Sequence, residues 1–195
     1  VIDLPCKGCC WDEWVAEAEK RGLPNFRSTV DCVPHYADAK NVALLQKFGV
    51  LSEKEIKARM EVLLENYAKT INIEALTMID MTKKKYIPTC IAYTKELCDA
   101  AAVKQSLDIC SCVEKELAEK VSSLTKAAYE ATEKLEAAVV AAAAKDDCVL
   151  SMAKSYREDV IPVMDDLRAA VDALEVITPS EKWPVPAYSD IIFNV

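Results

Sequence analysis

Apolar residues recur at helical spacing along most of the chain, and two segments repeat most regularly. In the first, roughly residues 106–145, the apolar positions alternate steps of three and four, with only Glu114 interrupting: Cys110, Leu117, Val121, Leu124, Ala128, Ala131, Leu135, Ala138 and Ala142. The second repeats the pattern and ends before Pro179: Val160, Met164, Leu167, Val171 and Leu174. Narrow seams of this kind are typical of long helices that pack along one another at small crossing angles.

A third long helix is predicted upstream of these two. Ser52 is followed three residues later by Glu55, the capping-box pattern that begins a helix. No helix breaker follows until Pro88, where we expect a kink or a short break because proline disfavours helical geometry before it. The helix then resumes to about residue 101.

Together these patterns predict an all-α fold, a long antiparallel helical bundle of about three long helices, one of them kinked near Pro88. Two short N-terminal helices, at 11–21 and roughly 35–48, precede the bundle, end at Gly22 and Gly49, and are separated by a loop. The expected organisation is therefore a linker with two short helices over 1–50, the bundle over 51–178, and an extended tail over 179–195.

The tail differs in composition from the rest of the chain. Pro184 and Pro186 favour an extended path, and the aromatic side chains around them require burial on the body or on a neighbouring subunit. Because aromatic residues are enriched in interface cores, the candidates for tail and interface contacts are Trp183, Tyr188 and Phe193.

The composition of the chain argues against several classes of function. The 195 residues carry 24 Lys and Arg against 32 Asp and Glu, a net charge of −8, which argues against nucleic acid and anionic membrane surfaces as partners. The longest apolar runs are too short to span a membrane. No glycine follows Gly49, which excludes glycine-rich phosphate loops from most of the chain. The sequence begins with Val1 and has no recognisable signal peptide, so we expect a fragment of a longer cytoplasmic protein.

Nine cysteines raise the question of a metal or redox site. Cys6, Cys9 and Cys10 form a C-x-x-C-C cluster, but a structural zinc site needs four ligands. Cys110 and Cys112 are two residues apart, which places them in different directions on a helix. We therefore expect reduced thiols, with a metal or redox sensor at the N-terminal cluster as the alternative. We expect Cys90, Cys98, Cys110 and Cys148 to act as small apolar residues of the core.

Glu74 is the most unusual carboxylate because its helix positions it among apolar residues. It shares a stripe, spaced by four, three, four and three residues, with Tyr67, Ile71, Met78 and Met81. A buried carboxylate needs a donor, and we expect a structural ion pair with Arg168, which lies beside Asp172 and Glu175 on the last helix. The alternatives are a catalytic Glu74 and a solvated Arg168–Asp172 pair.

His35 is the single histidine and follows a proline at an expected helix start. Catalysis by a histidine needs a partner nucleophile or carboxylate. Asp38, one turn on, suits a helix cap and a local pair equally. The residues alone therefore predict a soluble, acidic helical module, and no catalytic, cofactor-binding or metal-binding residue is assigned.

Several stretches of the chain resemble the C-terminal region of type III glutamine synthetases, among them Pro88 with Tyr93 and four longer segments. The longer segments are DEWVAEAEKRGLPN (12–25), KFGVLSEKEIKARMEVLLENYAKTINIEALTMIDM (47–81), YREDVIPVMDDLRAAVDALE (156–175) and WPVPAYSDIIF (183–193). The most specific are the YAKTINIEA block and the terminal W-P-x-P-x-Y motif. The middle helix, 106–145, carries no family signal.

This resemblance implies a role in nitrogen metabolism. The full enzyme is a ligase that joins ammonia to glutamate with ATP hydrolysis and divalent metal ions, Mg²⁺ or Mn²⁺, as stacked hexameric rings in a bacterial cytoplasm. Its catalytic motifs would lie upstream of Val1, so the 195-residue chain is expected to be inactive alone and to pack against its own catalytic domain and neighbouring subunits. The alternative is a free-standing helical protein-interaction module.

Overall fold

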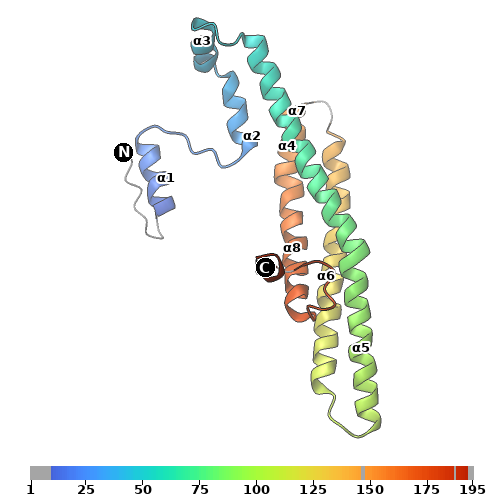
Figure 1. The fold of residues 1–195 in the computed structure, drawn as a ribbon. Helices are drawn as coiled ribbons and strands as arrows, with labels where there is room; N and C mark the ends of the chain where they lie inside the picture. The colour runs from blue at the N-terminus through green and yellow to red at the C-terminus, as the bar shows by residue number, and fades with distance from the viewer. Residues whose placement is uncertain (1–9, 146–147, 187, 193–195) are drawn as a thin grey trace. The chain divides into compact units, whose positions relative to one another are not determined.

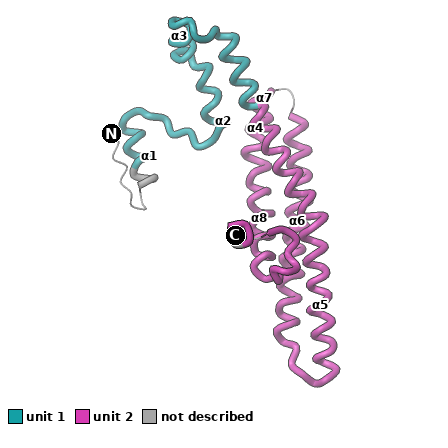
Figure 2. The backbone as a smooth tube through the Cα atoms, in the orientation of Figure 1, with its two compact units in different colours: residues 1–64 teal, residues 65–195 magenta. Residues whose placement is uncertain are grey.

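The computed structural model describes residues 10–145, 148–186 and 188–192. These described residues contain helices and no strand, which confirms the all-α class. The chain divides into two compact units, residues 1–64 and 65–195 (Figure 2). The boundary between them falls inside a long helix, whereas the sequence patterns place it near residue 50.

Unit 1 contains short helices. They are α1 (Cys10–Lys20), α2 (Thr29–Cys32), the 3-10 turn η1 (Val33–Ala37) and α3 (Ala39–Lys47). Gly22 and Gly49 follow α1 and α3 with φ of +70° and +64°, the left-handed geometry that glycine adopts at helix ends. Helix α2 and η1 occupy much of the segment expected to be a loop. Ser28 explains the difference, because its Oγ accepts a hydrogen bond from the Asp31 amide at 3.2 Å and caps α2.

Helix α4 (Glu53–Met81) begins as the capping box predicts. The Ser52 amide donates to Glu55 Oε2 at 2.7 Å, and the Glu55 amide donates to Ser52 Oγ at 3.3 Å. These reciprocal bonds satisfy two of the amides that a helix start leaves unpaired. Contacts with Ser52 also lower the pKa of the Glu55 carboxyl.

At Pro88, where we expected a kink or a short break, the helix is unbroken and contains a π-helical turn. Helix α4, the π-helical turn η2 (Thr82–Tyr86) and α5 (Ile87–Ser106) form one helix of 54 residues (Figure 1). Proline crowds the carbonyl four residues before it and donates no hydrogen bond. In the wider π turn the Ile87 amide donates to the Thr82 carbonyl, five residues back. The extra residue in this turn therefore accommodates Pro88.

The same arrangement recurs before Pro162. Helix α7 (Val149–Ser155), the π turn η3 (Tyr156–Val160) and α8 (Ile161–Ile177) follow one another without interruption. The Ile161 amide donates to the Tyr156 carbonyl, again five residues back. Helix α8 ends before Pro179, as predicted.

The core of unit 2 lies where three helical segments meet. Helix α6 (Cys112–Ala143) packs along α5 and along α8 (Figure 1). The two predicted seams supply much of this core, and their most buried members are Val121, Ala128, Leu135, Ala142, Val160, Leu167 and Leu174. Of the cysteines expected in the core, Cys90 is buried, whereas Cys98, Cys110 and Cys148 are exposed. Cys110 precedes α6 and so lies outside its apolar seam.

Candidate functional site

The tail is held on unit 2 by a cluster that we call the tail anchor: Tyr86, Cys90, Thr178 and Trp183. The Trp183 ring stacks on Tyr86, with centroids 5.1 Å apart and planes 15° apart. A turn after α8 positions Trp183, whose amide donates to the Pro179 carbonyl at 3.1 Å. The π turn supplies Tyr86 from the long helix. The anchor thus joins α5, the end of α8 and the tail.

Burial dominates the electrostatics of the tail anchor. It raises the pKa of the Tyr86 phenol, and the negative charges of Glu175 and Asp172 raise it further. Burial likewise raises the pKa of the Cys90 thiol. The Thr178 hydroxyl lies beside this thiol without a well-formed hydrogen bond. The Tyr86 phenol and the Cys90 thiol therefore stay neutral, and a neutral thiol or phenol is a poor nucleophile. The tail anchor is suited to packing the tail against unit 2.

Next to the anchor, α5 and α6 form a surface hollow of about 450 Å³ that we call the α5–α6 groove. Its lining residues are Ile87, Ile91, Thr94, Ser122, Thr125, Lys126 and Tyr129. Ile91 is 59% exposed and Tyr129 is 50% exposed. Three of the seven lining residues, Ile87, Ile91 and Tyr129, are large and largely apolar, and we take the groove as the candidate docking surface of unit 2.

Glu74 is exposed in the structure, which corrects the expectation that it is buried. The buried face of α4 runs through Ala68, Ala75 and Ile79, one position on from the predicted stripe. Two of these residues are alanines, which are only weakly apolar. The hydropathy pattern therefore pointed to the neighbouring stripe instead. Within the described ranges no ion pair joins Glu74 to the last helix.

Arg168 forms the local pair given as the alternative. Its Nε lies 3.6 Å from Asp172 Oδ2, and both side chains are more than 60% exposed. Glu175 is half-buried and lies near Tyr86. Among the tail candidates Trp183 is buried, the Tyr188 backbone begins α9 (Tyr188–Ile192), and Phe193 lies outside the described residues.

His35 pairs locally. Its Nδ1 lies 2.8 Å from Asp38 Oδ2, and its ring stacks on Phe26 at 4.3 Å between centroids. Both members of the pair are about half exposed. The arrangement matches the local pair that the sequence allowed.

The described residues contain neither a metal-ligand cluster nor a membrane-spanning helix. Over residues 10–145, 148–186 and 188–192, no three His, Cys, Asp or Glu side chains gather as a metal ion requires. Cys6 and Cys9 of the C-x-x-C-C cluster lie outside these ranges, as does the Cys10 side chain. In the same ranges no helix is long and apolar enough to cross a membrane.

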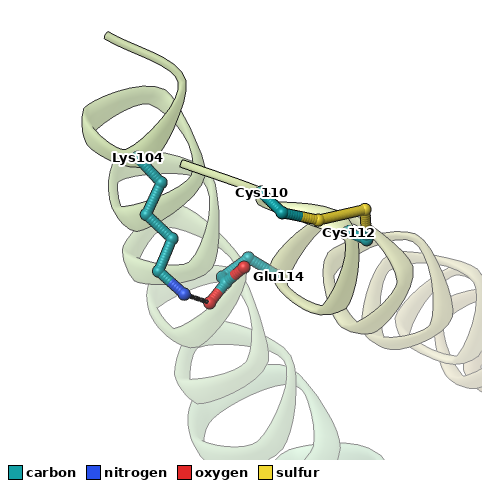
Figure 3. Close-up of a disulfide and its surroundings, with 4 residues drawn as sticks. All are labelled: Lys104, Cys110, Cys112 and Glu114. Carbon is teal, nitrogen blue, oxygen red and sulfur yellow. Dashed lines mark hydrogen bonds and ion pairs between the residues drawn. A yellow bond between two sulfur atoms is a disulfide. The ribbon is translucent and has the colours of Figure 1, made fainter. Parts of the chain in front are cut away.

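Two features of unit 2 were missed by sequence reasoning. Cys110 and Cys112 are disulfide-bonded (Figure 3), whereas we expected reduced thiols pointing apart on a helix. The expectation is wrong because Cys110 lies in the turn before α6. The second missed feature is the role of Tyr86 in the tail anchor. Its position could have indicated this role, because Tyr86 lies one turn from Cys90 and directly before Ile87-Pro88.

Comparisons with known proteins give a consistent result. A family model described as the glutamine synthetase C-terminal domain matches residues 10–105. The chain is 35% identical to a glutamine synthetase of Butyrivibrio fibrisolvens, over 94% of this chain and 26% of that protein. It is 32% identical to the type-3 glutamine synthetase of Dictyostelium discoideum, over 93% of this chain and 25% of that protein. The chain therefore spans about a quarter of the length of the curated relatives it matches.

Proposed function

Because this chain belongs to the glutamine synthetase family, as a C-terminal region of the type III kind, we propose that it is the structural helical domain of a glutamate–ammonia ligase. The whole enzyme would join ammonia to glutamate with ATP and a divalent metal, Mg²⁺ or Mn²⁺. Because this chain spans about a quarter of the length of its relatives, we propose that the catalytic groups lie elsewhere in the polypeptide.

The observation that carries the structural role is the α5–α6 groove. It leaves Ile91 and Tyr129 largely exposed, although both belong to helices whose other faces are buried in the core of unit 2. A domain that makes up about a quarter of its relatives meets further protein surface within its own polypeptide and its assembly. We infer that the groove receives a segment of the synthetase outside this chain.

The finer organisation follows from this role. Unit 2 serves as an antiparallel bundle that supports the docking surface, and the first 50 residues serve as the linker toward the catalytic part. The tail anchor fixes the tail internally, which leaves Ile191 and Ile192 of α9, each 65% exposed, for a neighbouring subunit. Stacked hexameric rings and a cytoplasmic location are the assembly and compartment that the family implies.

The test uses the full-length polypeptide and a pair of matched variants. Ile91→Asp combined with Tyr129→Asp places two charges in the groove, whereas Val103→Asp combined with Val113→Asp places two charges at equally exposed positions outside it. Light scattering gives the mass of each assembly, and glutamine formation gives its activity. The groove variant is expected to fall to smaller, less active species, while the control keeps the wild-type mass. Wild-type mass and activity in the groove variant would exclude this docking role.

The alternative of a free-standing interaction module makes a different prediction. It requires a natural polypeptide close to 21.6 kDa, whereas the synthetase domain requires one several times larger. The intact mass of the natural polypeptide distinguishes the two.

A further inference from the structure

The end of the α5–α6 hairpin, residues 98–119, differs from the rest of unit 2, and we call it the tip. It lies beyond the end of α8 (Figure 1). Among the described residues, the tail meets α5 at the ion pair between Lys182 and Glu96. The tip carries the Cys110–Cys112 disulfide, whose Cα atoms are 5.7 Å apart and whose residues are both exposed. This disulfide is therefore open to reagents in solution.

The disulfide surrounds a potential helix cap that has not formed. Ser111 precedes α6 and is followed three residues later by Glu114, the same S-x-x-E spacing as Ser52 and Glu55. The Ser111 side chain makes no capping hydrogen bond, and its φ and ψ are −116° and 31°. A capping residue normally has extended backbone. Ser111 is also buried, at 7% exposure.

Glu114 is engaged elsewhere in this state. Its carboxylate accepts a hydrogen bond from Lys104 Nζ across the hairpin (Figure 3). In the formed box at α4, the equivalent carboxylate of Glu55 accepts from the Ser52 amide. The two sites share a sequence pattern, but at the second the box is not formed and Ser111 lies between two cysteines that are covalently joined.

We propose that Cys110–Cys112 is a thiol–disulfide exchange site whose oxidation state switches the N-terminal cap of α6. The co-reactant is a dithiol, either a thioredoxin-type protein or a small molecule. One thiolate of the dithiol attacks a sulfur of the pair, the Cys110–Cys112 bond breaks, and a mixed disulfide forms. The second thiol of the dithiol then closes its own disulfide, so the dithiol loses two electrons and two protons and both cysteines become thiols.

Access and loop size favour exchange at this pair. Exchange rates depend on the accessibility of the attacked sulfur, and both residues are exposed. The bond joins residues separated by two positions, so its closure restricts little of the unfolded chain and its opening leaves the fold of unit 2 in place. Cys90, with no exposed surface, provides the internal contrast.

Reduction has a defined structural consequence. Without the bond, Ser111 can adopt extended backbone, and its Oγ can accept from the amide of Val113 or Glu114 as an N-cap does. The Glu114 carboxylate can leave Lys104 and accept from the Ser111 amide, completing the capping box. The reduced tip thus exchanges an interhelical ion pair for a better-capped α6.

Labelling tests the exchange directly in the full-length protein. Trypsin releases Gln105–Lys115, which contains Cys110, Cys112 and no other cysteine. After equilibration in an oxidised glutathione buffer, this peptide is expected to take up no alkylating reagent. Incubation of the folded protein with dithiothreitol or thioredoxin should give two labels, while Cys90 stays unlabelled. Two labels in the oxidising buffer, or none after reduction of the folded protein, would overturn the proposal.

Hydrogen exchange tests the switch. Reduction should slow exchange of the Val113 and Glu114 amides by roughly fivefold, as expected for a new N-cap. Ser111→Ala should abolish this slowing, and Cys110→Ser with Cys112→Ser should show slow exchange in either buffer. Cys98→Ser, which removes an exposed free cysteine of the same tip, should respond as the wild type does. Unchanged or faster exchange in the reduced wild type, or an intact response in Ser111→Ala, would contradict the cap switch.

Discussion

The α5–α6 hairpin has a covered part and an uncovered tip, although the same two helices form both. In the covered part Cys90, Val121 and Leu135 have no exposed surface, because α8 and the tail pack over them. In the tip Val103 and Val113 are at least 60% exposed. In this hairpin the large apolar side chains with no exposed surface are therefore those that α8 and the tail cover.

The two parts are also held together differently. The covered part depends on apolar packing and on the stack of Trp183 over Tyr86. In the tip an ion pair between Lys104 and Glu114 joins the two helices, and the Cys110–Cys112 disulfide joins near neighbours at the start of α6. Substitutions should therefore affect the two parts by different mechanisms and by different amounts.

Removing the cover should have the largest effect. Trp183→Ala deletes the ring that stacks on Tyr86, and buried aromatic truncations cost about 3–5 kcal/mol. The free energy of unfolding from urea titrations should fall by this amount, and Cys90 should become reactive toward a thiol reagent in the folded protein. A loss below about 1 kcal/mol would mean that the tail does not stabilise the covered part.

Truncations at two positions of α6, one in each part, should give the next largest difference. Leu135→Ala leaves a cavity under α8 and should cost about 2–5 kcal/mol. Val113→Ala at the tip should change the free energy of unfolding by no more than about 0.5 kcal/mol, as exposed substitutions do. Similar losses at the two positions would mean that the tip is covered in solution.

Alkaline pH should weaken the covered part selectively. The pKa of the Tyr86 phenol is raised in the folded state. The neutral phenol therefore contributes its full share to the free energy of unfolding at any pH below its unfolded pKa of about 10. As pH rises above that value the unfolded phenol ionises while the folded one stays neutral, and stability falls. Tyr86→Phe should reduce this loss between pH 10 and 11.5 in denaturant titrations. Identical pH slopes for the variant and the wild type would contradict this assignment.

The smallest effect is expected on the outer face of α8. Arg168 and Asp172 form an exposed i,i+4 pair, and such pairs contribute about 0.3–0.5 kcal/mol. Arg168→Ala should therefore lower the free energy of unfolding by no more than this amount. A loss of about 3 kcal/mol or more is expected when a buried pair is broken. Such a loss would support a buried ion pair between Arg168 and Glu74 in solution.

The sequence predicted correctly those features that depend on residue spacing within a single helix. The α4 capping box and the seams through Leu135 and Leu167 depend on local spacing, and the structure has them as expected. Glu74 was misplaced because the buried face of its helix contains alanine, which differs little from exposed positions in hydropathy.

The features missed from sequence depend on the path of the chain. The Trp183–Tyr86 stack joins residues far apart in sequence, and no local pattern encodes which aromatic residue meets which. The Cys110–Cys112 bond depends on where α6 begins, and helix boundaries are poorly defined by periodicity. The α5–α6 groove depends on which helix faces α8 leaves uncovered.

The most direct test of the docking role is hydroxyl-radical footprinting of Tyr129 in the isolated chain and in the full-length protein. Tyr129 lines the groove and is half exposed, Leu107 at the tip is 64% exposed, and Leu135 is fully buried and serves as the internal reference. The docking role predicts that Tyr129 oxidation falls severalfold in the full-length protein while Leu107 oxidation is unchanged. Equal Tyr129 oxidation in the two proteins would contradict it, because the groove would then stay open in the full-length protein.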